Sequence, residues 1–422
     1  MSTITWKGDA VAVLQETRAT PANANTGDTY TLTCAGESVS FTVAGTETVA
    51  AVTAGLTSAW NNSTAVEHEE VTASDEITHV KFVPDTSNNG AAGKPFVITG
   101  SVADGGSGAA PTLTMTTPTA NAGPNCWDTA DNWSGAAVPV NSDDVIIENS
   151  TVSILYGLAQ SAVTLDSLTV RQNYTGTIGL PRTNSPGGYI EYRETYLELS
   201  ATAVSIGQGD GTGSGRIKLN TGSVQATINV YGTGSALEST LGAFLWKGTH
   251  ASNVLNVNKG TVGVAMFGGE AATILTLGVG YTTNISGDAW LSCGSGTTLT
   301  TVNQSGGELF TASNMTTVTQ TDGEHTVRGT ATVTTYNLDG GKCFYESSGT
   351  LTTLYVGGGA EFDCRHDMRS RTITNCTAYQ DAVLRDPFKT VAWTNGIDLS
   401  RCGPLKVTLD IGEHFTLTPS AI

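Results

Sequence analysis

The last third of the chain repeats one short pattern. An apolar residue, two threonines and a second apolar or aromatic residue are followed, a few residues later, by a pair that contains glycine. Successive copies begin at Leu299, Met315, Val333 and Leu351, which gives steps of 16, 18 and 18 residues, and a weaker fifth copy lies at Thr372-Ile373-Thr374. A repeat of this length is too short to fold independently. Each copy therefore predicts one turn of a stack that buries its apolar face against its neighbours.

The residue types indicate what kind of stack this is. Threonine and valine favour strands, because branching at Cβ restricts χ1 in a helix. No 3.6-residue apolar period crosses the copies, which excludes helical repeats, and the leucine and asparagine ladder of leucine-rich repeats is missing. The sequence predicts an all-β chain with a parallel, right-handed β-helix (β-solenoid). Glycine adopts the positive φ angles that tight corners need, and the expected corner residues are Gly306, Gly307, Gly323, Gly340, Gly341, Gly358 and Gly359.

Charge and patterning limit the partners. The formal net charge of −18 argues against nucleic-acid binding, because a phosphate backbone needs a basic surface. No stretch approaches the ~18 apolar residues of a membrane helix, and the N-terminus lacks the basic start and apolar core of a secretory signal. We therefore expect a protein made in the cytoplasm, with its seven cysteines packed as free thiols. The sequence predicts no cofactor.

Four regions are expected along the chain. Residues 1–118 predict a β-rich N-terminal attachment domain with one helix, which Thr48 caps and which ends near Trp60. Residues 119–160 predict a linker and the cap at the start of the β-helix, residues 161–388 the β-helix, and residues 389–422 C-terminal strands that cap its last turn. The strands expected in the first region are Tyr30–Cys34, Ser38–Val43, Glu70–Thr72, Thr78–Val83 and Pro95–Thr99. Insertions at 179–196 and 232–248 are expected to project from corners as loops, where binding usually resides on a solenoid.

The segment NCWDTADNWSGAAVPVNSDDVII, residues 125–147, places Trp127 and Trp133 ahead of a short apolar strand. It resembles the segment that begins β-helical regions in bacterial surface proteins and in phage and prophage structural proteins. The resemblance implies that the two tryptophans cover the open first turn; the alternative is that they are ordinary core aromatics. More loosely, the pattern GDTYTLT…SVSFTV in residues 27–43 resembles small β-rich domains of phage tail and head-decoration proteins.

One pair of acidic residues is a candidate for catalysis. Right-handed β-helices include polysaccharide lyases, hydrolases and depolymerising tailspikes, and a retaining glycosidase needs two carboxyl groups about 5 Å apart. Alignment of the repeats puts Glu308 and Glu324 at the same position on neighbouring turns, followed by Lys342 and Ala360, and turns stack ~4.8 Å apart. A solvated row of charges is the favoured interpretation, because no cluster of aromatic and acidic residues lies nearby in the sequence.

A second acidic group is a candidate metal site. Asp143, Asp144 and Glu148 supply the oxygen ligands that calcium prefers. Adjacent acids ahead of a strand more often form a turn, and we favour that structural role.

The resemblance implies a non-enzymatic structural component of a phage or phage-like particle: a fibre, spike or decoration protein. Its N-terminal domain would dock onto other virion proteins of a capsid or tail, and its β-helix would project to stabilise the particle or to bind a host-surface glycan. We expect a homotrimer located in the virion and assembled in the host cytoplasm. Two alternatives stay open: a bacterial cell-surface adhesin, which would be extracellular, and a polysaccharide-depolymerising tailspike.

Overall fold

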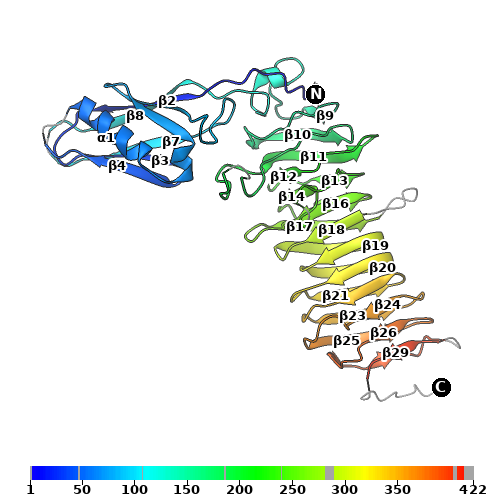
Figure 1. Cartoon of the computed structure of the whole chain (residues 1–422). Helices are drawn as coiled ribbons and strands as arrows, with labels where there is room; N and C mark the ends of the chain where they lie inside the picture. Colours follow the sequence, from blue (N-terminus) through cyan, green and yellow to red (C-terminus); the bar gives the residue numbers. More distant parts are fainter. Residues whose placement is uncertain are drawn as a thin grey trace.

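A computed structural model describes residues 2–45, 48–106, 108–184, 187–238, 240–280, 289–402 and 406–412. Within these ranges the chain is all-β, as predicted, with two α-helices, a 3₁₀ helix at Ala130–Asn132 and many parallel strands. Figure 1 shows a small N-terminal module beside one end of a long stack of strands that runs from β9 to β29. The module and the stack have separate hydrophobic cores. None of the helices in these ranges has the length and apolar character needed to cross a membrane.

The module consists of two antiparallel sheets and a helix. The sheet orders are β5-β6-β2-β8 and β4-β3-β7, and α1 contacts strands of both sheets. The elements are β2 (Glu16–Ala22), β3 (Thr29–Cys34), β4 (Glu37–Thr42), α1 (Val49–Asn61), α2 (Val66–Glu69), β5 (Val71–Asp75), β6 (Val80–Pro84), β7 (Ile98–Ala103) and β8 (Thr112–Thr119).

Local sequence explains the helix and the hairpin of the module. The Thr48 hydroxyl accepts a hydrogen bond from the backbone N–H of Ala51, and α1 buries Val52, Leu56 and Trp60. Between β3 and β4, the residues of the turn Ala35-Gly36 have φ angles of 50° and 99°. Two consecutive positive φ angles are typical of the tight turns that match the twist of a hairpin.

Two strands of the module were not predicted. The sequence does not indicate β2, because this strand contains few large apolar residues, although it lies between β6 and β8 in the sheet. β8 lies in a segment rich in Gly, Thr and Pro at the end of the predicted attachment domain, where no strand was expected, and it pairs with β2 along nearly its whole length. Leu113 and Met115 alternate with exposed threonines and pack against the module core, but an alternation this short is a weak signal for a strand.

The stack contains β1 and β9–β29, all paired in parallel, and the hydrogen-bonded strand order closes on itself. One series of neighbours runs β13-β15-β17-β19-β20-β21-β23-β25, and another runs β12-β14-β16-β18-β19-β20-β22-β24-β26-β29. The long strands β19 and β20 belong to both series. The bounds are β1 (Thr3–Thr5), β9 (Asp144–Ile147), β10 (Ala159–Arg171), β11 (Leu197–Gln208), β12 (Ile217–Asn220), β13 (Thr227–Val230), β14 (Phe244–Lys247), β15 (Val254–Val257), β16 (Gly260–Val264), β17 (Ala272–Val279), β18 (Ala289–Cys293), β19 (Thr297–Thr311), β20 (Asn314–Val327), β21 (Val333–Leu338), β22 (Lys342–Tyr345), β23 (Leu351–Val356), β24 (Glu361–Asp363), β25 (Arg371–Ala378), β26 (Val383–Arg385), β27 (Val391–Trp393), β28 (Ile397–Asp398) and β29 (Thr408–Asp410).

The sequence repeat corresponds residue by residue to the strand register. Leu299 lies opposite Met315, Met315 opposite Val333, Val333 opposite Leu351, and Leu351 opposite Ile373. These side chains are buried, and so are their partners three residues later in the first four copies. The alignment of the copies from sequence is therefore confirmed at these apolar positions.

The corner glycines serve two purposes. Gly307, Gly323, Gly341, Gly358 and Gly359 have positive φ angles, as predicted, whereas Gly306 and Gly340 do not. At Gly323 and Gly341 the backbones of neighbouring corners also approach each other closely. A Cβ atom would lie 2.5 Å from the Gly307 carbonyl oxygen in the first case and 2.4 Å from that of Gly323 in the second. Only glycine fits this succession of stacked corners.

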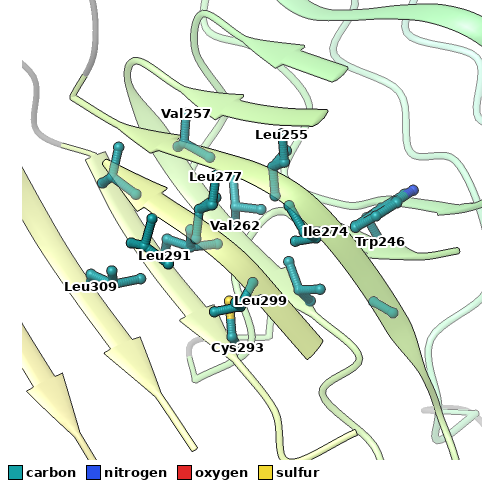
Figure 2. Packing of buried hydrophobic residues seen from close by; sticks show 14 of the residues in the cluster. Trp246, Leu255, Val257, Val262, Ile274, Leu277, Leu291, Cys293, Leu299 and Leu309 are labelled. Carbon is teal, nitrogen blue, oxygen red and sulfur yellow. The ribbon is translucent and has the colours of Figure 1, made fainter. Parts of the chain in front are cut away.

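The interior of the stack is a continuous apolar core. Figure 2 shows the side chains of Trp246, Leu255, Ile274 and Leu277 gathered between neighbouring strands of the stack. The insertion predicted at 232–248 is thus a loop only in part, because its end forms β14 and buries Trp246. Six of the seven cysteines are buried, and all seven are free thiols.

A hydrogen-bonded chain of polar side chains crosses this core. Tyr336 donates to Gln320 Oε1 over 2.7 Å, and its oxygen lies 2.7 Å from His325 Nδ1. His325 Nε2 lies 2.9 Å from the Thr311 hydroxyl. Because Tyr336 already donates to Gln320, its oxygen accepts from Nδ1–H, and Nε2 accepts from Thr311. The neutral imidazole is therefore fully paired.

His325 makes the stack sensitive to acid. Burial lowers its pKa from 6.5 to about 3, so between these values the unfolded chain binds a proton that the folded chain excludes. We expect the free energy of unfolding to fall by up to about 1.4 kcal/mol per pH unit across this window. Chemical denaturation at pH 7, 5 and 4 should show that the free energy of unfolding falls less with decreasing pH in His325→Leu than in the parent protein. The partly exposed His250→Gln should keep the parent slope, and equal slopes for His325→Leu would contradict this assignment.

The first residues of the chain belong to the stack and not to the module. β1 pairs in parallel with β9, at Thr3 with Asp144 and Thr5 with Ile146. Ile4 and Trp6 lie in the core of the stack. The predicted domain of residues 1–118 is therefore corrected at its start: the chain first completes the end of the stack and then forms the module. Sequence alone could not show this, because the paired strands are about 140 residues apart.

Three tryptophans close this end of the stack. Trp127 and Trp133 are fully buried and pack edge to face at 4.6 Å, and Trp6 packs against Trp133 at 4.9 Å. The Trp133 indole donates to the Trp127 carbonyl oxygen over 2.7 Å. Trp127 and Trp133 thus lie at the end of the stack, where the resemblance placed them, and Trp6 is a third member that the sequence did not indicate.

The C-terminal region continues the stack. β27 and β28 pair in parallel with β25, and β29 pairs with β26. The predicted boundary at residue 388 is therefore not a change of structure. Most of the tail expected to cap the last turn, residues 413–422, lies outside the described residues.

Candidate functional site

The predicted acid pair is an exposed row on the outer surface of the stack. Glu308 on β19 lies opposite Glu324 on β20, and Glu324 lies opposite Lys342 on β22. The next member is Glu361, not Ala360, because the register places Glu361 opposite Lys342, with their charged groups 3.6 Å apart. Glu308 and Glu324 are both exposed. They line neither of the two hollows described below, which favours the solvated row of charges over catalysis.

The predicted metal ligands each have a separate protein partner. Asp143 accepts hydrogen bonds from the Ser2 hydroxyl at 2.5 Å and from the Val140 backbone N–H at 2.9 Å, and the Ser2 hydroxyl lowers the pKa of this carboxyl group. Asp144 accepts from a serine hydroxyl on β10, and Glu148 pairs with an arginine of the same strand. Within the described ranges no cluster of three potential ligands occurs. These carboxylates therefore hold the first strands together.

A polar hollow of about 610 Å³ lies on the outer surface near the C-terminal end of the stack. Its wall is a row of outward-facing residues on successive strands: Asn337 of β21, Tyr355 of β23, Thr377 of β25 and Asp398 of β28. Tyr379 stands beside this row, with its ring 6.4 Å from that of Tyr355. Repeating turns thus place two aromatic rings among amide, hydroxyl and carboxylate groups.

Glycines and charges define the rest of this hollow. Gly357 and Gly358 line the hollow and bring no side chains into it. Tyr379 packs close to Gly357, since a Cβ atom on Gly357 would lie 3.1 Å from the Cβ atom of Tyr379. The Ser400 hydroxyl and backbone N–H, together with Arg401, keep the pKa of Asp398 below its ordinary value. Asp398 is therefore ionised at neutral pH. The hollow offers fixed acceptors and an arginine donor beside the tyrosine rings.

A second feature joins the module to the stack. The buried carboxylate of Glu70 accepts from Lys94 of the module at 2.6 Å and from Tyr192 of the stack at 2.7 Å. It also pairs with Tyr189 and Arg193. The last three residues lie in the insertion 179–196, which was predicted to be a binding loop. The insertion therefore binds the N-terminal module of the same chain through Glu70, and we call this group of contacts the Glu70 clamp.

A cavity of about 610 Å³ lies beside this clamp, between the module and the stack. Phe96 and Ile98 of the module and Leu155 and Leu180 of the stack contribute apolar walls, and Asp128 of the connecting segment contributes a carboxylate. Burial raises the pKa of Asp128. No local sequence signal indicates this cavity, because its walls come from segments far apart in the chain.

The hollow on the stack was missed for a different reason. Tyr355 aligns with Asn337 and Thr377 in the repeat, so the alignment already placed it on the outer surface. The signal that could have revealed the site was a second tyrosine, Tyr379, at an outward position of the next turn. Comparison with known protein families and with curated proteins finds no match to this chain.

Proposed function

We propose that this protein is a structural component of a phage or phage-like particle, in which the module attaches and the stack projects. The observation that carries the proposal is the division of the chain into a small module with its own core and a long stack joined to it at one end. The remaining length of the stack is free to extend from whatever surface holds the module.

We further propose that the stack is a β-helix. Support comes from the two series of parallel strands, in which each strand pairs with its counterpart one turn later, and from the single core that they enclose. Such a rod gains stability from contacts between neighbouring turns, which suits a fibre or spike. Association into a homotrimer is part of the same proposal and is tested by the mass of the purified protein in solution.

Replacing residues 15–118 by a short glycine–serine link should separate attachment from folding. The link is sterically feasible because the backbone N–H of Val13 donates to the Ala122 carbonyl oxygen over 2.8 Å, so the two ends meet. β1 is retained in this variant. We expect this variant to keep a folded stack that unfolds cooperatively but to be missing from purified particles. Incorporation at the parent copy number, or loss of the folded stack, would contradict the proposed division of roles.

The hollow near the C-terminal end is our candidate for contact with a host-surface glycan. Tyrosine rings offer an apolar face and a polar edge, and the neighbouring Asn337, Asp398 and Arg401 supply hydrogen-bond acceptors and donors for hydroxyl groups. Placement far from the module leaves the hollow accessible when the module is attached. A groove of this composition fits an oligosaccharide better than an apolar ligand.

Tyr379→Ala should weaken binding to the polysaccharide of a susceptible host by about tenfold. Surface plasmon resonance with immobilised polysaccharide would measure this change. Tyr231→Ala, which removes a partly buried tyrosine outside the hollow, is the matched control. Equal affinities of the two variants would remove the hollow from the proposal. If the parent protein released reducing ends from the polysaccharide and Glu308→Gln abolished this release, the depolymerising tailspike would be favoured instead.

A further inference from the structure

The cavity between the module and the stack has no part in the functions proposed above, although Tyr192 and Arg193 of its lining also bind Glu70. Its apolar walls come from both parts of the chain and from the segment that connects them. Binding sites for small molecules are concave and mostly apolar, they contain a few converging polar groups, and they occur preferentially between domains. The junction cavity meets each of these conditions.

One buried hydrogen-bond acceptor in this cavity lacks a donor, and an exposed carboxylate lies in the same lining. The Oδ1 atom of Asn121 is buried and has no hydrogen-bond partner within the described part of the chain, while the amide nitrogen of the same side chain already donates to Cys126 Sγ at 3.2 Å. Buried polar atoms without a partner are rare in folded proteins. Because Asn121 also lines the cavity, its Oδ1 atom is available to a ligand that brings an N–H or O–H donor.

Asp128 is the second acceptor. Asp128 is an exposed residue that lines the cavity, and among the described residues no lysine or arginine forms an ion pair with it. Arg193, which also lines the cavity, is already committed to Glu70, Glu191 and the Pro95 carbonyl oxygen. Gly157 lets the carboxylate lie close to the backbone, since a Cβ atom there would be 2.3 Å from Asp128 Oδ1. The cavity therefore holds an unneutralised negative charge beside apolar walls.

We propose that the junction cavity binds a small apolar amine, with its ammonium group toward Asp128 and Asn121 and its hydrocarbon part against the apolar walls. A cation suits both acceptors, and the net charge of −18 favours approach of cations from solution. Because the walls belong to the module and to the stack, a bound amine contacts both. Its binding therefore fastens the junction beside the Glu70 clamp.

Calorimetric titration of the full chain with three ligands of equal length, n-octylammonium, n-octanol and n-octanoate, tests this proposal. The hydrocarbon part is the same in all three, so differences in affinity report the head group. We expect n-octylammonium to bind about tenfold or more tighter than n-octanoate, because a hydrogen bond to a charged group contributes more than a neutral one. n-Octylammonium binding no tighter than n-octanoate would overturn the proposal.

Three variants locate the binding. Asp128→Asn should reduce the affinity for n-octylammonium about tenfold while changing that for n-octanol about twofold or less. Asp131→Asn, an exposed carboxylate close by that does not line the cavity, should change neither affinity. Ala120→Phe, which adds a large ring at an exposed residue of the cavity lining, should abolish binding of both ligands. Unchanged n-octylammonium binding in Asp128→Asn or in Ala120→Phe would show that the ligand binds elsewhere and would overturn the assignment.

Discussion

Replacing Glu70 by glutamine should release the N-terminal module from the stack. The buried carboxylate of Glu70 unites Lys94 of the module with Tyr189, Tyr192 and Arg193 of the stack. Removal of one partner from a buried ion pair costs about 3–5 kcal/mol, because the remaining charges are left without compensation. Each part keeps its own core, so we expect the junction to open while both parts stay folded.

Small-angle X-ray scattering would detect this opening as an increased radius of gyration, and limited proteolysis would detect it as faster cleavage of the connecting segment near residue 120. Glu69→Gln is the matched control, because Glu69 is the exposed neighbour of Glu70. The same scattering profile for the parent and for Glu70→Gln would show that the clamp does not hold the junction.

The clamp should also open in acid. Burial alone would raise the pKa of Glu70, but Arg193, Lys94 and Tyr189 outweigh it and hold this pKa below the ordinary 4.5. A carboxyl group with a lowered pKa in the folded state contributes stability above its unfolded value and loses it as the pH falls through its folded value. The increase in radius of gyration of the parent protein should therefore begin only below about pH 4.5, whereas Glu70→Gln should be open at pH 7.

Trp133→Ala should produce the largest loss of stability in the stack. The Trp133 ring is fully buried between Trp6 and Trp127 and donates to the Trp127 carbonyl oxygen. Truncation of a buried tryptophan costs about 3–5 kcal/mol. The loss falls at the end of the stack, where β9 has only the short β1 beyond it. Chemical denaturation would measure the loss.

Hydrogen exchange would show where the stack opens in Trp133→Ala. We expect faster exchange first at β1 and β9, since neighbouring turns stabilise each other and the end turns have fewer neighbours. Trp290→Ala is the control, because Trp290 is partly exposed on an outer face and lies outside the core. Equal losses of stability in the two variants would mean that the tryptophan cluster does not close the stack.

Much of the repetitive architecture could be predicted from the sequence. Leu299, Met315, Val333 and Leu351 occur in the same order and spacing in which the strands stack. This succeeds because a short repeat packs only against its neighbours, so that its period in the sequence is also its register in the stack. The capped helix and the hairpin of the module were predictable for a similar reason, since caps and turns depend on a few adjacent residues.

The sites could not be predicted to the same extent. The alignment put Glu308 and Glu324 on neighbouring turns correctly, but position in the repeat says nothing about whether an outer face is hollow or flat. The hollow that does exist depends on Tyr379 standing beside the row that contains Tyr355. The acids at Asp143 and Asp144 were correctly placed before a strand, yet their partners lie on other strands, remote in the chain.

The sequence by itself determined that the chain is all-β, which residues face the core in the repeated turns, and where the glycine corners fall. Only the tertiary structure decided that Thr3–Thr5 completes the stack beyond β9, that an insertion of the stack holds Glu70 of the module, and that a cavity lies between them. The physical reason is the range of the interactions. Strand propensity, turns and repeat spacing are properties of neighbouring residues, whereas β1 with β9 and Glu70 with Arg193 join segments more than a hundred residues apart, and such contacts form only when the whole chain has folded.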